Sequence, residues 1–151
     1  MITHKKNIIN FQKKFDFNEL ANFKDQNNLE SEFSTIFVHP KFVLESPIKI
    51  SNVNNDFYFN NIFEFLNKEY NPKKLKSNLF LFFSFSGGGK SMPHKDKEDV
   101  VIIGLYGKVM YVVENKNFEL EEGDLIVIPA GVTHRAIGLC PRITLSFGVY
   151  G

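Results

Sequence analysis

Three side chains in the second half of the chain are of types that bind metals. His94 and Asp96 lie two positions apart, and His134 follows Asp96 after 134 − 96 = 38 positions. On an extended segment, a spacing of two places both side chains on the same face. Two imidazoles and one carboxylate on one side of an ion form the facial triad of non-heme iron(II) sites, which leaves other coordination positions open. The three residues therefore predict a divalent metal site that still has room for a ligand.

The protonation state of the two histidines determines the pH range in which such a site binds a metal. Imidazoles bind a metal only when they are neutral, so metal affinity should fall at acid pH. An HxD pair alone is common, and a single histidine is more often structural than metal-binding. We accordingly interpret His4 and His39 as surface or turn residues, and we look to the sequence around the other two histidines for support.

The elements that must position these residues are short strands. Residues 78–150 contain strand-like runs separated by turns such as those at Gly107, Gly123 and Gly131. The expected strands are 78–86, 99–103, 108–114, 117–120, 124–128, 134–137 and 142–149. Many short strands at regular spacing are typical of a sandwich or barrel. Three or four of them separate Asp96 from His134, enough for a closed barrel to bring His134 back beside the first two residues.

The first half of the chain, residues 1–77, mixes helical and extended patterns. Asp16 is placed to cap a helix whose apolar residues recur from Phe17 to Phe23, and Asn60 to cap a second helix that ends at 71–72. Residues 33–38 read as a strand, and 42–50 as an edge strand because it contains Pro47. No linker or repeat divides the sequence, so we expect one domain over 1–151, with 1–77 packing on a barrel formed by 78–151.

Composition excludes several classes of protein. The chain has 151 residues, 43% of them hydrophobic and 23% charged, with a net charge of +1. This is the profile of a globular domain without the basic excess of a nucleic-acid or membrane-surface binder. The one cysteine, Cys140, has no partner within the chain, and the sequence shows no secretory leader or apolar membrane span. We expect a cytoplasmic protein that binds neither nucleic acid nor membrane.

Two longer motifs surround the three candidate ligands. The first runs from Gly88 through His94 and Asp96 to Gly107, and the second is Gly123-x5-Pro129-x-Gly131-x2-His134. Both resemble the conserved motifs of the cupin superfamily, in which glycines allow tight turns and the final histidine points inward. The resemblance implies an all-β fold, the cupin double-stranded β-helix or jelly-roll barrel, here with one or two N-terminal helices.

Asp96 indicates which branch of the cupins the sequence resembles. Cupins typically carry a second histidine at this position, whereas the JmjC-like, cupin-8 branch carries an aspartate. The stretch 83–108 is similar to the bacterial ribosomal oxygenases in that branch, which use iron(II), 2-oxoglutarate and O2 to hydroxylate a side chain. The resemblance implies an iron(II)- and 2-oxoglutarate-dependent oxygenase in which His94, Asp96 and His134 are the catalytic metal ligands. The sequence ends at Gly151, before the further domains of those relatives, so we expect a small-molecule or peptide substrate.

The anchor for 2-oxoglutarate departs from the pattern of that branch. A Lys or Arg usually stands two residues after the strand-opening glycine, here Gly107, but this position is Val109. Lys108 reaches the interior only if a bulge shifts the register, because alternation points it to the opposite face. Arg142, eight residues after His134, is the other candidate, since other oxygenase branches hold 2-oxoglutarate with a basic residue there and guanidinium suits carboxylate. Hydroxyl groups offer weaker contacts; the candidates for cofactor binding are Arg142, Lys108, Ser84 and Ser91.

Two alternatives stay open at this point. Without a basic anchor, the same metal site suits a lyase, an isomerase or a dioxygenase that needs no keto acid. A non-catalytic, metal-binding cupin is the third hypothesis, although structural sites usually fill all positions with protein ligands. The sequence fixes neither the substrate nor the oligomeric state, and a homodimer paired through edge strands, as in many cupins, remains an open expectation.

Overall fold

The computed structural model describes residues 2–11, 13–27, 48–85 and 92–150. The strand expected at 33–38 and most of the segment 42–50 lie outside these residues. Two helices are described, α1 (Phe17–Asn27) and α3 (Asn60–Tyr70), with a short 3-10 turn, η2 (Val53–Asn55). The strands are β1 (Thr3–Lys5), β2 (Ile48–Ile50), β3 (Lys76–Ser84), β4 (Val100–Tyr106), β5 (Val109–Val113), β6 (Lys116–Leu120), β7 (Leu125–Ile128), β8 (His134–Gly138) and β9 (Arg142–Tyr150).

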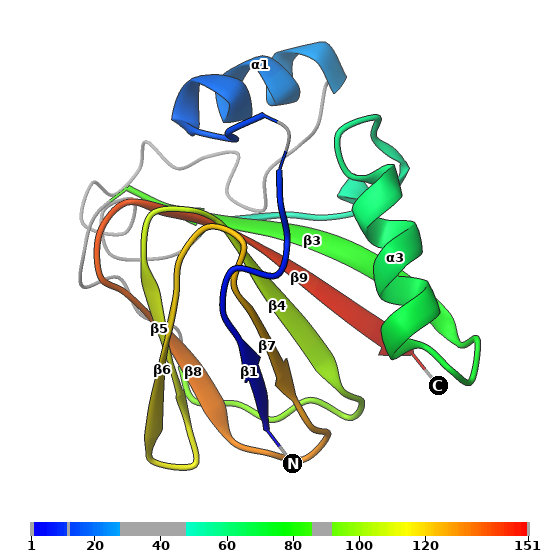
Figure 1. Ribbon diagram of the computed structural model, residues 1–151, viewed down its shortest axis with the longest axis vertical. Helices are drawn as coiled ribbons and strands as arrows, with labels where there is room; N and C mark the ends of the chain where they lie inside the picture. The colour runs from blue at the N-terminus through cyan, green and yellow to red at the C-terminus, as the bar shows by residue number, and fades with distance from the viewer. Residues whose placement is uncertain (1, 12, 28–47, 86–91, 151) are drawn as a thin grey trace.

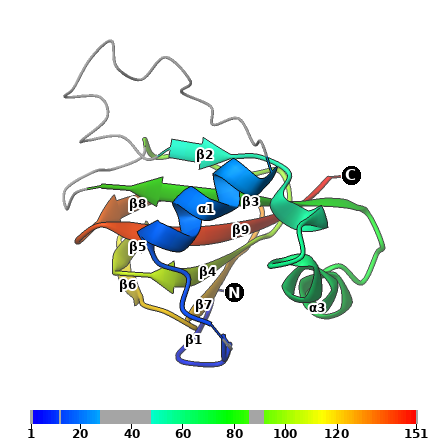
Figure 2. The same ribbon diagram turned by 90° about the horizontal axis from the view of Figure 1, so that it is seen from above.

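The strands form two antiparallel sheets. The larger sheet has the order β1-β7-β4-β9-β3-β2, and the smaller one has the order β6-β5-β8. Figures 1 and 2 show the helices on one side of the larger sheet and β5, β6 and β8 on the other. This confirms the expected all-β jelly roll with N-terminal helices. Within the described residues, neither helix has the length and apolar character needed to cross a bilayer.

Strand β4 of the larger sheet is buried on both faces. Along β4, Val101 and Ile103 belong to the core shared with the helices, whereas Val100 and Ile102 belong to the core between the sheets. A strand covered on both sides has no polar face, which explains why β4 reads as an unbroken apolar run rather than an alternation. Strand β3 is different: Leu79, Leu81 and Phe83 are buried toward the helices, but its other face is only partly covered.

Phenylalanines of the first half build the outer core. Phe15, Phe23 and Phe59 pack edge to face, with ring centroids 5.2 to 5.9 Å apart. Phe63 of α3 contacts Phe147 of β9 in the same manner, at 5.9 Å. Edge-to-face pairs add to the free energy gained by burying these large rings. The aromatic residues thus hold both helices against the outer face of the larger sheet.

Two of the three helix ends predicted from the sequence match the structure. Asp16 caps α1, because its Oδ1 accepts the backbone N–H of Glu19 at 3.0 Å, as expected of an N-cap. Helix α3 ends at Tyr70, before Asn71 and Pro72, as expected. The prediction that Asn60 caps α3 is wrong: Asn60 is the first helical residue, Phe59 precedes it as the cap, and no side chain bonds the free N–H groups there.

Strand β1 was not expected from the sequence. It pairs with β7, and the segment after it is held by the buried carboxylate of Asp124, whose side chain is 3% exposed. Asp124 accepts hydrogen bonds from Lys6 Nζ at 2.5 Å, Asn7 N–H at 2.7 Å and Glu121 N–H at 2.8 Å. Burial alone would raise the pKa of Asp124, but these donors outweigh it and hold the pKa below its usual value.

Asp124→Asn should destabilise the protein at neutral pH by about 1 to 3 kcal/mol, the range for losing charge-assisted bonds to a buried group. A pKa that is lower in the folded than in the unfolded state contributes stability above the unfolded pKa, about 3.9. That stability is lost as the pH falls through the folded value. Urea unfolding at pH 7 and at pH 3 should therefore show the difference shrinking in acid. Glu122→Gln, an exposed neighbour, is the control, and an equal loss in both variants would contradict the assignment.

Candidate metal centre

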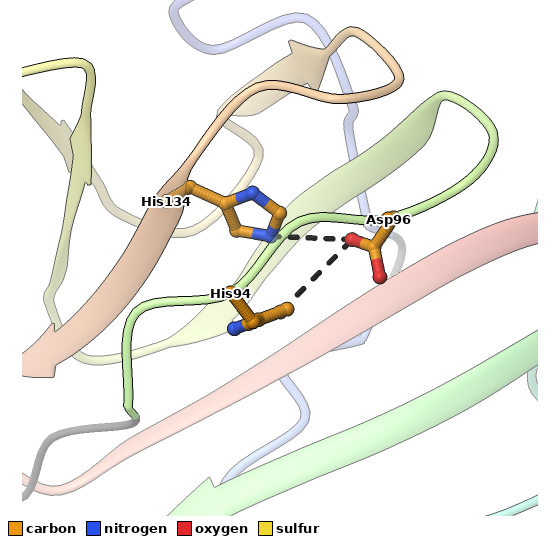
Figure 3. A group of neighbouring side chains, drawn as sticks. All are labelled: His94, Asp96 and His134. Carbon is orange, nitrogen blue, oxygen red and sulfur yellow. Dashed lines mark ion pairs between the residues drawn. The ribbon is translucent and has the colours of Figure 1, made fainter.

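The side chains of His94, Asp96 and His134 converge at one end of the barrel. Their ligand atoms all lie within 4.8 Å of one another. Asp96 Oδ2 is 3.3 Å from His134 Nε2 and 4.0 Å from His94 Nε2. Figure 3 shows the carboxylate facing both imidazole rings, whose centroids are 4.3 Å apart. One carboxylate oxygen and two imidazole nitrogens converging in this way suit a divalent transition metal.

Backbone pairing brings the two histidines together. His94 and His134 form an isolated antiparallel bridge, with N–H to O distances of 3.0 Å from residue 94 and 2.9 Å from residue 134. Asp96 is fixed next to it, because its carbonyl accepts the N–H of Gly131 at 2.9 Å. Gly131 has a φ of +78°, a conformation that glycine adopts without strain. The motif glycine therefore serves the turn that returns the chain to the metal ligands.

The Nδ1 atoms of both imidazole rings, which point away from Asp96, also have hydrogen-bond partners. The Nδ1 of His94 lies 3.0 Å from the carbonyl of Met92, and the Nδ1 of His134 lies 3.0 Å from the carbonyl of Val132. A carbonyl accepts hydrogen bonds, so each Nδ1 carries the proton and each Nε2 keeps its lone pair for a metal. The two rings have the same arrangement, residue i bonding to residue i − 2, and both are oriented before a metal arrives.

One metal ligand is buried, and the other two are partly exposed to solvent. The side chain of His134 is 4% exposed, whereas those of His94 and Asp96 are 49% and 41% exposed. Burial lowers the pKa of His134, because it disfavours the charged ring, and the contacts with Val132 and Asp96 only partly oppose this. His134 is therefore neutral at neutral pH, the form that binds a metal.

A cavity of about 630 Å³ extends from these residues into the barrel. Its volume is in the range of small-molecule sites. Its walls are mainly apolar, and two basic side chains reach it from the larger sheet: Arg142 from β9 and Lys49 from β2. The three candidate ligands and Arg142 thus share one cavity, although 142 − 96 = 46 positions separate Arg142 from Asp96.

Arg142 is 2% exposed and lies among neutral hydroxyl groups. Its Nη1 donates to Thr144 Oγ1 at 2.5 Å and its Nε donates to Ser84 Oγ at 3.3 Å, while the Tyr111 hydroxyl lies within hydrogen-bonding reach. Among the described residues no carboxylate forms an ion pair with it. Burial consequently lowers the pKa of Arg142, although an arginine stays charged under all ordinary conditions. A buried cation without an acidic partner favours the binding of an anion.

The other residues predicted to bind a cofactor lie elsewhere. Lys108 is 52% exposed and pairs with Glu121 at 3.0 Å outside the cavity. The register does shift between Gly104 and Tyr106, but the alternation of β5 still turns Val109 inward and leaves Lys108 outside. The structure therefore does not support Lys108 as an anchor. Ser84 contacts Arg142 and does not line the cavity, and Ser91 lies outside the described residues.

Sequence reasoning missed Lys49 and Tyr150, which also line the cavity. Lys49 stands between Ile48 and Ile50, both buried, so its side chain points to the opposite face of β2. The alternation of residues 48–50 could have predicted that Lys49 points away from its two neighbours. It could not show which face of this edge strand meets the cavity. Tyr150 lies at the cavity mouth, where burial and then the charge of Asp96 raise the pKa of its phenol.

Known proteins share this fold. The family model described as Cupin domain matches residues 81–138. The ribosomal oxygenase YcfD from Escherichia coli is similar in structure, with a TM-score of 0.72 at 22% identity, covering 99% of this chain and 48% of that one. Its complex with cobalt and 2-oxoglutarate gives a TM-score of 0.73 at 22% identity, covering 100% and 48%. Its complex with cobalt and succinic acid gives 0.71 at 22% identity, covering 99% and 48%. No curated protein sequence matches the chain.

These likenesses confirm the cupin fold that the motifs indicated. The chain spans about half the length of YcfD, with 48% of that protein covered. The activity, substrate and partners of YcfD are therefore not transferred by the fold.

The metal site gives a direct prediction. The intact protein should bind one cobalt(II) ion, measured by titration calorimetry. Alanine at position 94, 96 or 134 should weaken binding by about 100-fold or more, since removing even an outer hydrogen-bond partner of a ligand costs 10- to 100-fold. His4→Ala is the matched control, because that ring packs on Phe118 away from the site. Undiminished affinity in all three variants would exclude this metal centre.

Proposed function

We propose that the protein is an iron(II)- and 2-oxoglutarate-dependent oxygenase that hydroxylates a substrate bound in the cavity. His94, Asp96 and His134 would hold the metal, and Arg142 would bind the distal carboxylate of 2-oxoglutarate. The observation that carries the proposal is Arg142: a guanidinium buried in the same cavity as the metal ligands, with no acidic partner among the described residues. The fold shared with YcfD, which has been seen with cobalt and 2-oxoglutarate, supports the same reading.

The register of the strands supports Arg142 as the anchor. Val113 pairs with His134, and Tyr111 pairs with Ala136, two residues deeper along β5 and β8. Two residues of strand correspond to about 7 Å. Arg142 contacts Tyr111, so its guanidinium lies roughly that far below the level of His134. A keto diacid that reaches the metal with one end can span this interval with the other.

The hydroxyl groups around Arg142 complete the anchor. Thr144 and Ser84 accept hydrogen bonds from the guanidinium and so fix the direction of its remaining N–H groups. Burial raises the pKa of Tyr111, while Arg142 and Thr144 oppose that shift. The phenol therefore stays protonated and can donate to an incoming carboxylate. The protein would supply a fixed, charge-assisted set of donors for one carboxylate, the kind of contact that gives both affinity and orientation.

Iron(II), when bound, would supply the redox chemistry that couples conversion of 2-oxoglutarate and O2 into succinate and CO2 to insertion of one oxygen atom into a substrate C–H bond. The protein's own residues orient the metal ligands and keep bulk water away from the site. The Nδ1 protons of both histidines stay on their carbonyl partners, which keeps both Nε2 atoms directed at the metal. The apolar walls formed by Val100, Ile102 and Ala136 shield that side from bulk solvent.

Arg142→Met tests the anchor. We expect 2-oxoglutarate affinity, measured calorimetrically with cobalt(II) bound, to fall by about 100-fold, because a charge-assisted contact in a desolvated site contributes about 1.5 to 3 kcal/mol or more. Cobalt(II) affinity should remain within about threefold. Lys108→Met, which removes a lysine outside the cavity, should leave both affinities unchanged. Loss of 2-oxoglutarate binding in the Lys108 variant and not in the Arg142 variant would reverse the assignment.

Turnover tests the activity itself. Iron(II)-loaded protein should form succinate from 2-oxoglutarate in air at a low uncoupled rate, as measured by chromatography, and Asp96→Ala should abolish it. An anaerobic mixture of protein, iron(II) and 2-oxoglutarate should show a visible absorption band that is missing without the protein. Neither succinate nor a band, in protein shown to bind metal, would overturn the proposal and favour a metal-dependent cupin chemistry without a keto acid.

A further inference from the structure

The cavity contains a second cationic group that the chemistry above does not use. Lys49 of β2 is half-buried, and its Nζ lies 4.8 Å from the centroid of the Phe80 ring. Within the part of the chain that the structure describes, no carboxylate pairs with this ammonium group. A lysine held over an aromatic ring at the wall of a cavity keeps its charge available for an anionic ligand.

The strand register separates Lys49 from Arg142. Lys49 pairs with Phe82, which pairs with Thr144, so Lys49 and Thr144 are level along their strands. Strand β3 lies between β2 and β9, so Lys49 and Thr144 are two strand spacings apart, or about 10 Å, and Arg142 lies two residues farther along β9. The two cations therefore present two anion positions, one at Arg142 and one at Lys49, beside the ring of Phe80.

The acidic residues of the cavity do not compete for Lys49. Asp96 Oδ2 faces the imidazoles of His94 and His134, and Asp99 Oδ1 accepts the N–H of Ala130 at 2.9 Å. Glu98 is the remaining acid of the lining, next to the exposed Lys97. Among the described residues no carboxylate of the lining pairs with Lys49, so its ammonium group favours an anionic over a cationic ligand.

We propose that Lys49, with Phe80 and Phe82, forms the subsite that selects the substrate, and that the substrate is an organic acid with an apolar body. Its carboxylate would lie at the Lys49 ammonium, and its body would pack on the two rings, leaving a C–H bond directed toward His94, Asp96 and His134. This rests on the proposed function insofar as 2-oxoglutarate takes the Arg142 position and leaves the Lys49 position for a second molecule.

The test compares acid and amide forms of the same probe. Phenylacetate and indole-3-acetate, with phenylacetamide and indole-3-acetamide, are titrated against the protein by ligand-observed NMR, with and without cobalt(II) and 2-oxoglutarate. We expect each acid to bind about tenfold more tightly than its amide, the size of one charge-assisted contact. Lys49→Met should abolish that preference, Lys49→Arg should retain it, and Lys97→Met, a lysine of the same lining, should change it less than twofold.

Each outcome bears on the inference separately from the proposed function. Acid preference that depends on Lys49 and persists in Arg142→Met supports it, even if 2-oxoglutarate fails to bind. No acid preference, or an equal loss in the Lys97 variant, overturns it, since a general positive field would then explain binding. A fall in 2-oxoglutarate affinity in Lys49→Met as large as that in Arg142→Met also overturns it, because Lys49 would then serve the cosubstrate. Thermal unfolding and cobalt(II) affinity, both expected to be unchanged, show that the variants are folded.

Discussion

The pairing of His94 with His134 is the contact on which the rest of the site depends. Two backbone hydrogen bonds join segments that are far apart in sequence. Once they form, Asp96 is positioned through Gly131, and each imidazole turns its Nδ1 to a carbonyl two residues earlier. The geometry of the metal ligands thus follows from main-chain pairing, which is more rigid than any contact among the side chains themselves. The same pairing brings the start of β8 to the level where β9 ends, and this defines the mouth of the cavity.

Much of the site was readable from the sequence because its parts are local. The HxD spacing and the glycines of the two motifs encode extended segments and tight turns, both decided within a few residues. The strands of the second half followed from the same kind of signal, and β3 to β9 lie close to the predicted ranges. The cap at Asp16 was equally local, since its carboxylate needs only the N–H three residues on.

The parts that could not be read depend on distant chain segments. Strand β1 has three residues and no apolar pattern, and it forms because β7 and the carboxylate of Asp124 offer it partners. The alternation of β5 correctly placed Lys108 on the outside, and the sequence offered Arg142 as the other candidate, but only the pairing of distant strands shows that Arg142 lines the cavity. Lys49 was missed because its relevance depends on which face of an edge strand meets the cavity, and that is decided by Phe82 of the neighbouring strand.

The two faces of the larger sheet divide its residues into two sets. In β3, Leu79, Leu81 and Phe83 bind the helices to the barrel, while Phe80 and Phe82 between them face the cavity. Replacing a residue of the second set alters what the cavity accepts without opening a void in the helix-side core. Related chains can therefore diversify their ligands along alternate positions of one strand while the other positions, and with them the folded state, stay constant.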